Sequence, residues 1–298
     1  MIIAIVFAFC AASTFAVSTS VQHHATGGAP RSAGLLRLLG YLVRRPMWLV
    51  GQALGTAAFG LHALALHAGQ LAVVQPIVIS GIVWAVPARA AMSRRLPSRA
   101  EVRAVIVTAI GLAAFLVASD PTTGRKTAYQ TSAVVLTVIG AAAAGAAYLI
   151  AVYVGHHPRR RALFYGIAAG VLFGMVAALL KMCLEELASN GLLGVLADWP
   201  LYGLIVAGAG GVLVNQRAYQ TAGLSASMPV LNIADVITAL LFGLLVFHEI
   251  PRHSPWLILV ELLSLAAIGL GLVMLVRLEE TFIDNPEKVV EHPNIIVK

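Results

Sequence analysis

The chain has 298 residues, of which 59% are hydrophobic and 11% charged, and its mean hydropathy is +0.89. A soluble domain carries about a quarter charged residues and cannot bury this much apolar surface, so the composition excludes a water-soluble protein. The formal charge of +7 predicts no nucleic-acid partner, because the basic residues lie in short loops, where they set the orientation of a membrane protein.

Nine apolar segments follow one another along the chain, and each is long enough to cross the bilayer as a helix. They cover residues 2–21, 47–67, 71–92, 102–119, 132–154, 162–182, 200–219, 224–247 and 256–276. Helices are favoured because lipid offers the backbone no hydrogen bonds and the apolar runs are continuous. The first segment lacks a positively charged start, so we interpret it as a transmembrane helix and not as a signal peptide.

The basic residues are distributed unevenly between the loops. Of the 20 Lys and Arg, sixteen lie in or directly beside alternate loops and the tail 278–298, and four lie in or beside the remaining loops. This bias predicts a multi-pass protein of the cell inner membrane with an external N-terminus and a cytoplasmic C-terminus. The segment 32–45 interleaves leucines with arginines, and we interpret it either as an interfacial amphipathic helix or as a loop that only sets topology.

The chain also matches itself at a fixed offset. A shift of 153 residues aligns Pro76 with Pro229. After a short gap in the next loop, the run Ala-Ile-Gly-Leu occurs at 109–112 and again at 267–270. Such self-similarity indicates an internal repeat, a common plan among secondary transporters.

The repeat defines the expected domain organisation. We predict one transmembrane domain over residues 1–277, with a first repeat at 1–119, a linking helix at 132–154 and a second repeat at 162–277. The odd linking helix places the second repeat upside down relative to the first. The predicted fold is therefore an all-α membrane protein with about nine transmembrane helices in two inverted repeats.

One carboxyl is predicted deep in the membrane. Asp235 lies about 17 Å from the start of its segment at 1.5 Å per residue, near the bilayer midplane, where an ionisable group is costly and usually functional. Arg217 lies too far along the preceding segment for an easy ion pair. Asn232 shares the face of Asp235. We predict that Asp235 couples transport to protons or binds a substrate ammonium group, and the alternative is a structural, hydrogen-bonded carboxyl.

Other polar residues extend this predicted site across the repeat. The offset aligns Asn215 with His62, and it aligns Gln75 with a methionine. We place His62 and Gln75 in the outer third of the membrane, Asp235 in the middle, and the two asparagines in the inner third. The paired Pro76 and Pro229 each remove one helical hydrogen bond, which predicts two broken helices lining the site. For His62, a structural interhelical hydrogen bond remains the alternative.

Catalytic signatures are absent from the sequence. The chain has no phosphate-binding loop, no His-Glu-x-x-His motif and no Gly-x-Ser-x-Gly motif. We therefore expect no enzymatic activity, no cofactor and no resident metal. Any uphill transport then draws on an ion gradient and not on ATP.

Several segments resemble a known family. Met-Pro-Val-Leu at 228–231, the run ending in Phe-His-Glu at 247–249 and the glycine-containing stretch 266–271 resemble the end of each repeat in the EamA-like branch of the drug/metabolite transporter superfamily. In that pattern a proline opens one helix, a small residue and a glutamate close it, and a glycine-rich helix follows. Glu249 stands at the position of the family glutamate.

The resemblance implies a secondary transporter, and we expect an exporter of a small organic metabolite or drug. Its expected partners are the lipid bilayer, a small-molecule solute and a proton as coupling ion, with a homodimer as one possible assembly. A nine-helix plan is also similar to NIPA-like magnesium transporters, although magnesium prefers several oxygen ligands. A membrane scaffold or lipid-handling protein that moves no solute is the third alternative.

Overall fold

The computed structural model describes residues 1–26, 44–81, 83–84, 97–118, 130–154, 157–221, 224–249 and 255–284. In these ranges the chain forms α1 (Ile2–Thr26), α3 (Pro46–Ala68), α4 (Leu71–Ile79), α6 (Arg99–Ala118), α7 (Gln130–Tyr153), α8 (Pro158–Ala197), α9 (Trp199–Thr221), α10 (Leu224–Leu245) and α11 (Pro255–Asp284). Each of these helices overlaps one predicted segment. The predicted amphipathic segment 32–45 lies almost entirely outside the described residues, as do the second half of the segment 71–92 and most of the tail.

The coarse prediction of a helical membrane protein is confirmed. Five described helices are long and apolar enough to cross a membrane: Pro46–Ala68, Arg99–Ala118, Gln130–Tyr153, Pro158–Ala197 and Trp256–Leu275. Shorter apolar stretches occupy Ile2–Ser18, Trp199–Asn215 and Val230–Leu245. Many large apolar side chains of these helices are exposed, as expected of a protein whose surface faces lipid.

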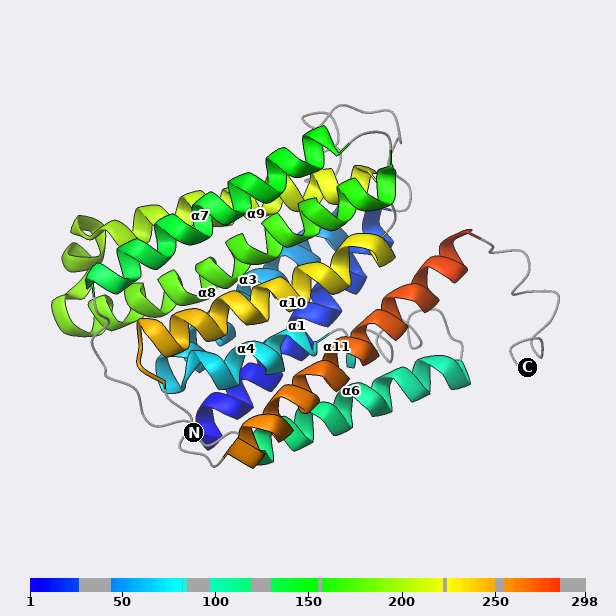
Figure 1. The fold of residues 1–298 in the computed structure, drawn as a ribbon, viewed down its shortest axis with the longest axis horizontal. Helices are drawn as coiled ribbons and strands as arrows, with labels where there is room; N and C mark the ends of the chain where they lie inside the picture. Colours follow the sequence, from blue (N-terminus) through cyan, green and yellow to red (C-terminus); the bar gives the residue numbers. More distant parts are fainter. Residues whose placement is uncertain are drawn as a thin grey trace.

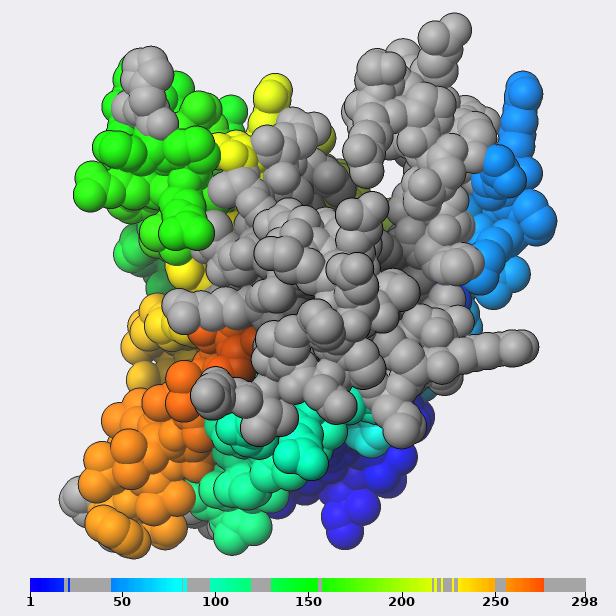
Figure 2. Space-filling view, turned by 90° about the vertical axis from the view of Figure 1, so that its right-hand side faces the viewer, coloured from blue at the N-terminus to red at the C-terminus, as the bar shows by residue number. Residues whose placement is uncertain are grey.

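The helices form one bundle with a separate pair at its side (Figure 1). The strongest contacts join α1 to α3, α8 to α9, α8 to α10, and α6 to α11. Short α4 lies against both α1 and α10, while α7 packs mainly on α8. Figure 2 shows α6 and α11 side by side on the surface.

Small residues bring α8 and α10 together. A Cβ atom added to Gly166 would lie 2.6 Å from the Ser227 carbonyl oxygen, and one added to Gly174 would lie 2.6 Å from the Asp235 carbonyl oxygen. Gly170, between them, approaches the backbone of α10 still more closely. This glycine stripe therefore allows backbone contact between the two helices, as small residues do in membrane proteins. It also fixes the position of the α10 turn that carries Asp235.

The pair of α6 and α11 is also closely packed. Ser98 and Glu101 cap the start of α6, because the Ser98 amide donates to the Glu101 carboxylate and the Glu101 amide donates to the Ser98 hydroxyl. Further along, a Cβ atom on Gly111 would lie 3.0 Å from the Cβ atom of Ala267. The two segments that match each other in the sequence, 109–112 and 267–270, thus face one another across this pair.

Candidate functional site

A short row of buried polar side chains crosses three helices. His62 from α3, Gln75 from α4 and Asp235 from α10 are exposed by 7%, 3% and 7%. The Gln75 Nε2 atom donates a hydrogen bond of 2.7 Å to the Asp235 Oδ1 atom, and the same Gln75 side chain lies beside His62. The fold thus brings together three residues that the sequence analysis proposed for a site, although it had placed Gln75 and Asp235 at different depths.

Two atoms of this row lack a hydrogen-bond partner. They are His62 Nε2 and Gln75 Oε1, and both are buried. A buried polar atom without a partner costs about 1–3 kcal/mol, so native proteins usually satisfy it with water or a ligand. The row therefore has unused hydrogen-bonding capacity at its His62 end.

Asp235 has no cation beside it among the described residues. Its one hydrogen-bond partner in that part of the chain is Gln75. Arg217, the candidate for a structural ion pair, is exposed on α9, and no ion pair joins it to Asp235 in the described structure. An uncompensated carboxyl in an apolar bundle is costly as an anion, so Asp235 is suited to exchange a proton or to take a cationic partner.

Pro76 and Pro229 were predicted to break their helices, but neither α4 nor α10 is interrupted at its proline. Pro76 is fully buried inside α4, which continues to Ile79 and then turns. In this turn the Ser80 amide donates to the Pro76 carbonyl and the Gly81 amide to the Val78 carbonyl. α10 likewise runs through residue 229. One proline removes a single helical hydrogen bond, and the packing of α4 and α10 tolerates that loss.

The remaining predicted residues do not join the row. Asn215 lies on α9 with its Oδ1 atom buried and without a partner, and Asn232 is half-buried on α10. Among the described residues, no hydrogen bond links either of them to His62, Gln75 or Asp235. The predicted polar track is therefore shorter in the structure than in the sequence analysis.

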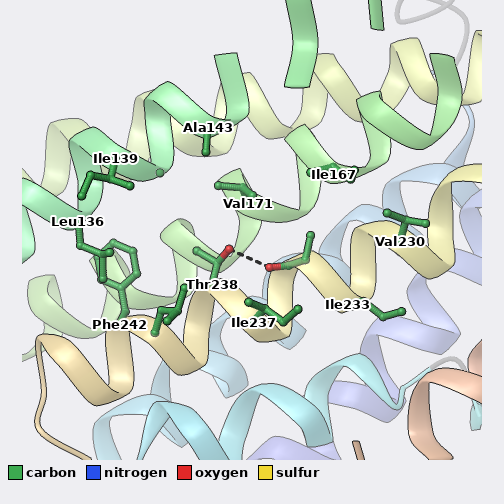
Figure 3. Close-up of a pocket in the computed structure, with 13 residues that line it drawn as sticks. Leu136, Ile139, Ala143, Ile167, Val171, Val230, Ile233, Ile237, Thr238 and Phe242 are labelled. Atoms are coloured by element: carbon green, nitrogen blue, oxygen red, sulfur yellow. Dashed lines mark hydrogen bonds between the residues drawn. The ribbon is translucent and has the colours of Figure 1, made fainter. Parts of the chain in front are cut away.

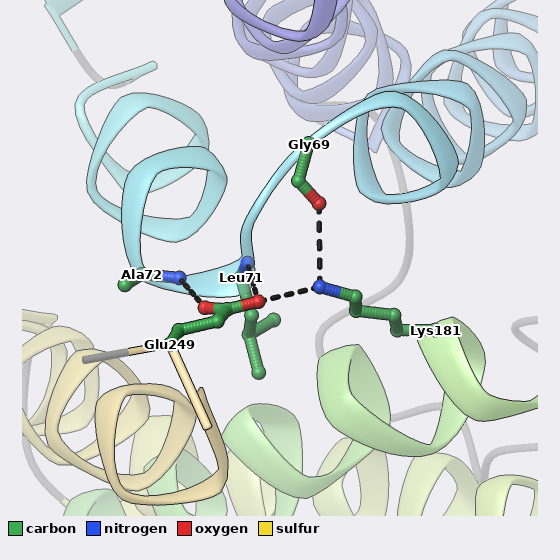
Figure 4. Close-up of polar contacts among 5 residues, drawn as sticks. All are labelled: Gly69, Leu71, Ala72, Lys181 and Glu249. Atoms are coloured by element: carbon green, nitrogen blue, oxygen red, sulfur yellow. Dashed lines mark hydrogen bonds and ion pairs between the residues drawn. The ribbon is translucent and has the colours of Figure 1, made fainter. Parts of the chain in front are cut away.

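A second polar cluster lies at the start of α4 and centres on Glu249 (Figure 4). Its Oε1 and Oε2 atoms accept hydrogen bonds of 3.0 Å from the backbone amides of Leu71 and Ala72. The Lys181 Nζ atom of α8 lies 2.5 Å from Glu249 Oε1 and 3.3 Å from the Gly69 carbonyl oxygen. The carboxylate thus caps α4, satisfies two free amides and meets a cation, which are three favourable interactions for a buried anion.

The end of α10 is shaped to deliver this carboxylate. The chain reverses at His248, which has a φ of 53° in the left-handed region. The Glu249 amide then donates to the Gly243 carbonyl at 2.9 Å, so the backbone returns to the level of Gly243. A Cβ atom on Gly243 would lie 2.8 Å from Glu249 Oε2, so the glycine leaves room for the folded-back side chain.

Lys181 belongs to this cluster. It lies on α8 four residues before Glu185, and within the described structure its ion pair is with Glu249. Its ammonium group also lies 4.5 Å from the centre of the Phe247 ring, a favourable cation–π distance. The sequence separation between Lys181 and Glu249 gives no local signal for this contact.

An apolar groove of about 400 Å³ lies between α7, α8 and α10 (Figure 3). Leu136, Val171 and Ile237 are among its lining residues. Its one hydroxyl-bearing lining residue, Thr238, donates to the Ala234 carbonyl at 2.8 Å and so is satisfied within α10. This groove therefore offers apolar contact, and none of the three residues of the polar row lines it.

The described residues contain no group of three or more His, Cys, Asp or Glu side chains that could hold a metal ion.

Comparisons with known proteins give one informative match. An uncharacterized protein of Corynebacterium glutamicum is 28% identical over 285 residues, which cover 94% of this chain and 93% of that protein. No known protein-family profile matches the chain, and no solved structure matches it. The chain is thus similar over nearly its full length to a bacterial protein of the same size.

Proposed function

We propose that the chain is a secondary transporter of the drug/metabolite transporter type, which exports a small organic solute and couples its movement to protons. The observation that carries this proposal is Asp235, a buried carboxyl in an apolar helix bundle whose hydrogen-bond partner is Gln75 and beside which the described residues place no cation. Intramembrane carboxyls of this kind typically serve ion or substrate pathways. The row that ends at His62 extends the proposed pathway.

The contact pattern of the helices supports the inverted-repeat plan. In that plan α1, α3, α4 and α6 correspond to α8, α9, α10 and α11. The close pair of α1 and α3 then matches the close pair of α8 and α9, and the contact of α4 with α1 matches that of α10 with α8. The pairs α4–α10 and α6–α11 join each element to its own counterpart, as elements beside a two-fold axis do.

Two aligned small residues support the same plan in more detail. At the offset of 153, Gly81 aligns with Ala234. A Cβ atom on Gly81 would lie 2.8 Å from the Ala12 carbonyl oxygen of α1, and a Cβ atom on Gly170 of α8 would lie 2.8 Å from the Ala234 Cβ atom. Each aligned residue thus lies at a close approach to the first helix of its own repeat.

The Glu249 cluster is suited to close one side of the pathway. It ties the start of α4, which carries Gln75, to α8 and to the end of α10, which carries Asp235. The predicted topology places this cluster on the outer side. In the proposed cycle, Asp235 communicates with the cytoplasmic side while the cluster is intact, and separation of α4 from Glu249 opens the outer side.

The first experiment identifies the solute. Metabolites are compared, without prior selection, in cells that lack the protein and in cells that overproduce it. An exporter of an organic solute should lower the cellular content of that solute on overproduction and raise it on deletion. Unchanged metabolites together with changed magnesium content would instead favour the cation-transport alternative.

The second experiment tests Asp235 with that solute in proteoliposomes. Asp235→Asn keeps the shape of the side chain and a hydrogen bond to Gln75 but removes the titrating group. We expect pH-driven accumulation to fall at least tenfold while exchange of solute across the membrane at equal pH is retained. The control is Asp198→Asn, the same chemical change at the end of α8, where Asp198 contacts Gln130 and the Trp199 amide.

The outcomes separate the alternatives. Loss of both accumulation and exchange would assign Asp235 to binding a substrate cation, because removal of the charge weakens binding itself. Full pH-driven accumulation by Asp235→Asn would refute proton coupling at this residue. A scaffold would show no solute flux in the unmodified protein.

A further inference from the structure

The row of buried groups has a fixed hydrogen-bond direction. A carboxylate only accepts hydrogen bonds, whereas an amide side chain donates through its nitrogen and accepts through its oxygen. Gln75 therefore turns its Nε2 atom to Asp235, and the bond of 2.7 Å shows this arrangement. Its Oε1 atom is then left for the His62 side, where it is buried without a partner.

The same rules fix the complementary role of His62. A glutamine oxygen facing His62 is satisfied by an imidazole nitrogen that carries a proton, directly or through one water molecule. The Nε2 atom of His62 is the buried nitrogen without a partner. With Asp235 ionised, the arrangement of lowest cost therefore has a proton on His62 Nε2.

Protonation of Asp235 reverses these requirements. A carboxylic acid has one O–H donor, and its best partner in the row is the oxygen of Gln75. The protonated carboxyl keeps an acceptor oxygen, but its new O–H needs an acceptor, and a rotation of the Gln75 amide by about half a turn supplies one. This rotation directs the Gln75 Nε2 atom to His62. A donor facing His62 requires a bare Nε2 lone pair, so the imidazole proton has to lie on the other ring nitrogen.

We infer that Gln75 is a positioning residue that couples proton binding at Asp235 to the tautomer of His62, through a reversal of its side-chain amide. This inference rests on the proposed function of Asp235 as the proton-binding group. It links α10, which binds the proton, to α3 through α4. The proton state of the site thereby reaches a third helix without any movement of charge to that helix.

The surroundings favour this coupling over direct control by other charges. The described charged groups on the elements that pack against α4 and α10 lie near the helix ends or outside the row. They are Lys181, Glu185 and Glu249 in or beside the Glu249 cluster, Arg159, Arg160, Arg161 and Glu186 elsewhere on α8, Arg45 before α3, Arg99, Glu101 and Arg103 in the first turns of α6, Arg217 on α9 and Glu261 on α11. Within the described residues, none of them forms a hydrogen bond or ion pair with the row. Gln75 is therefore the polar connection between His62 and Asp235.

The coupling has an unusual sign that makes it testable. An isolated histidine gains protons as pH falls. In this row, Nε2 of His62 should lose its proton as pH falls through the titration of Asp235, because Gln75 then presents a donor to it. A solvated histidine with no such partner shows the opposite direction.

The test uses nuclear magnetic resonance of the full chain in lipid bilayers, with ¹⁵N-labelled histidine and ¹³C-labelled aspartate. The signals are identified by their loss in His62→Asn and Asp235→Asn. We expect His62 Nε2 to change from proton-bearing to bare at the midpoint at which the Asp235 carboxyl becomes protonated. The change should vanish in Asp235→Asn.

Substitution of Gln75 tests whether Gln75 couples the His62 transition to the titration of Asp235 or whether the two transitions only share a midpoint. Gln75→Met removes both hydrogen-bonding groups, and Gln75→Asn keeps an amide but shortens its reach by one methylene group and serves if the methionine variant fails to fold. In either variant His62 should no longer follow Asp235, while Asp235 still titrates. The matched control is Gln52→Met, an exposed position on α3, which should leave both transitions unchanged.

Two results would overturn the inference. One is a His62 Nε2 atom that stays in a single state while Asp235 titrates, and the other is an unchanged His62 transition in both Gln75 variants. These spectra need no solute, so their outcome is independent of the flux measurements that test the transport proposal.

Discussion

The Lys181 ammonium group and the Glu249 carboxylate depend on one another for their burial. The Lys181 side chain is 11% exposed and the Glu249 side chain is 1% exposed. Taking one such charge out of water costs several kcal/mol, and the partner together with the free amides of α4 offsets this cost. Removal of a single member therefore leaves an uncompensated charge in an apolar environment.

We expect Lys181→Met and Glu249→Gln each to lower the free energy of unfolding by about 3 kcal/mol. The double variant should lose less than the sum, because both charges are then gone. The measurement is a double-mutant cycle of unfolding in detergent micelles. The control is Glu186→Gln, the same chemical change five residues after Lys181 on α8. Glutamine keeps the oxygen that accepts a hydrogen bond from Asn190, so this change should have little effect. Strict additivity of the two single changes would contradict the ion pair.

At the scale of residues, the sequence predicted that Asp235 lies inside the bundle, but it did not predict which side chain Asp235 contacts. Asp235 stands out because an acidic residue interrupts an apolar segment. Its bond to Gln75 could not be predicted, since depth was counted from segment starts. α4 starts beside Gly243, about 12 Å along α10 from Asp235 at 1.5 Å per residue. Gln75 lies about 6 Å further into α4 by the same measure, and its side chain spans the remaining distance to Asp235.

At the scale of elements, the contact between α8 and α10 determines where Asp235 lies. The glycines of α8 approach the backbone of α10 beside Leu231 and Asp235. Gly170→Ala places a methyl group onto the Leu231 carbonyl oxygen, so the helices have to separate. Overpacking of this kind costs about 1–3 kcal/mol.

We therefore expect Gly170→Ala to destabilise the protein by about 2 kcal/mol and to displace Asp235 from Gln75. The readouts are thermal unfolding and, for the site, the titration of the Asp235 carboxyl. Gly145→Ala is the matched control, because a Cβ atom there meets nothing within 4 Å and alanine is the better helix former by about 1 kcal/mol. Equal behaviour of the two variants would show that the α8–α10 contact is looser than described.

The apolar pattern predicted the existence of the helices and most of their ends. The segment expected at 162–182 is the clearest exception, because the helix continues to the kink at Gly191 and resumes after it as far as Ala197. A hydropathy window ends where charged residues begin, whereas a helix continues past Lys181, Glu185 and Glu186 as long as nothing breaks its hydrogen bonds. The proline at position 76 predicted a break that does not occur, because α4 ends in the turn at Ser80 and Gly81 and not at Pro76.

At the scale of the whole molecule, the orientation in the membrane is a prediction from charge alone. Sixteen of the 20 basic residues lie on one predicted side, so we expect the C-terminus in the cytoplasm. A reporter fused after residue 298 should be active if it requires the cytoplasm and inactive if it requires export. The paired fusion at the N-terminus should behave in the opposite way, and the reverse result for both would invert the proposed sides of the Glu249 cluster.

The length of α8 has a consequence for the surrounding lipid. The part of α8 before Gly191, residues 158–190, corresponds to about 50 Å of helix, which is well beyond the hydrocarbon thickness of about 30 Å. At Gly191 the backbone leaves the helical path with a φ of 70°, which glycine adopts at no steric cost. Leu192 and Leu193 follow, exposed by 66% and 81%. We expect such a bent, leucine-bearing end to lie at the headgroup boundary. Bilayers of different thickness should then tilt or release it, so membrane composition should act directly on α8 and its Lys181.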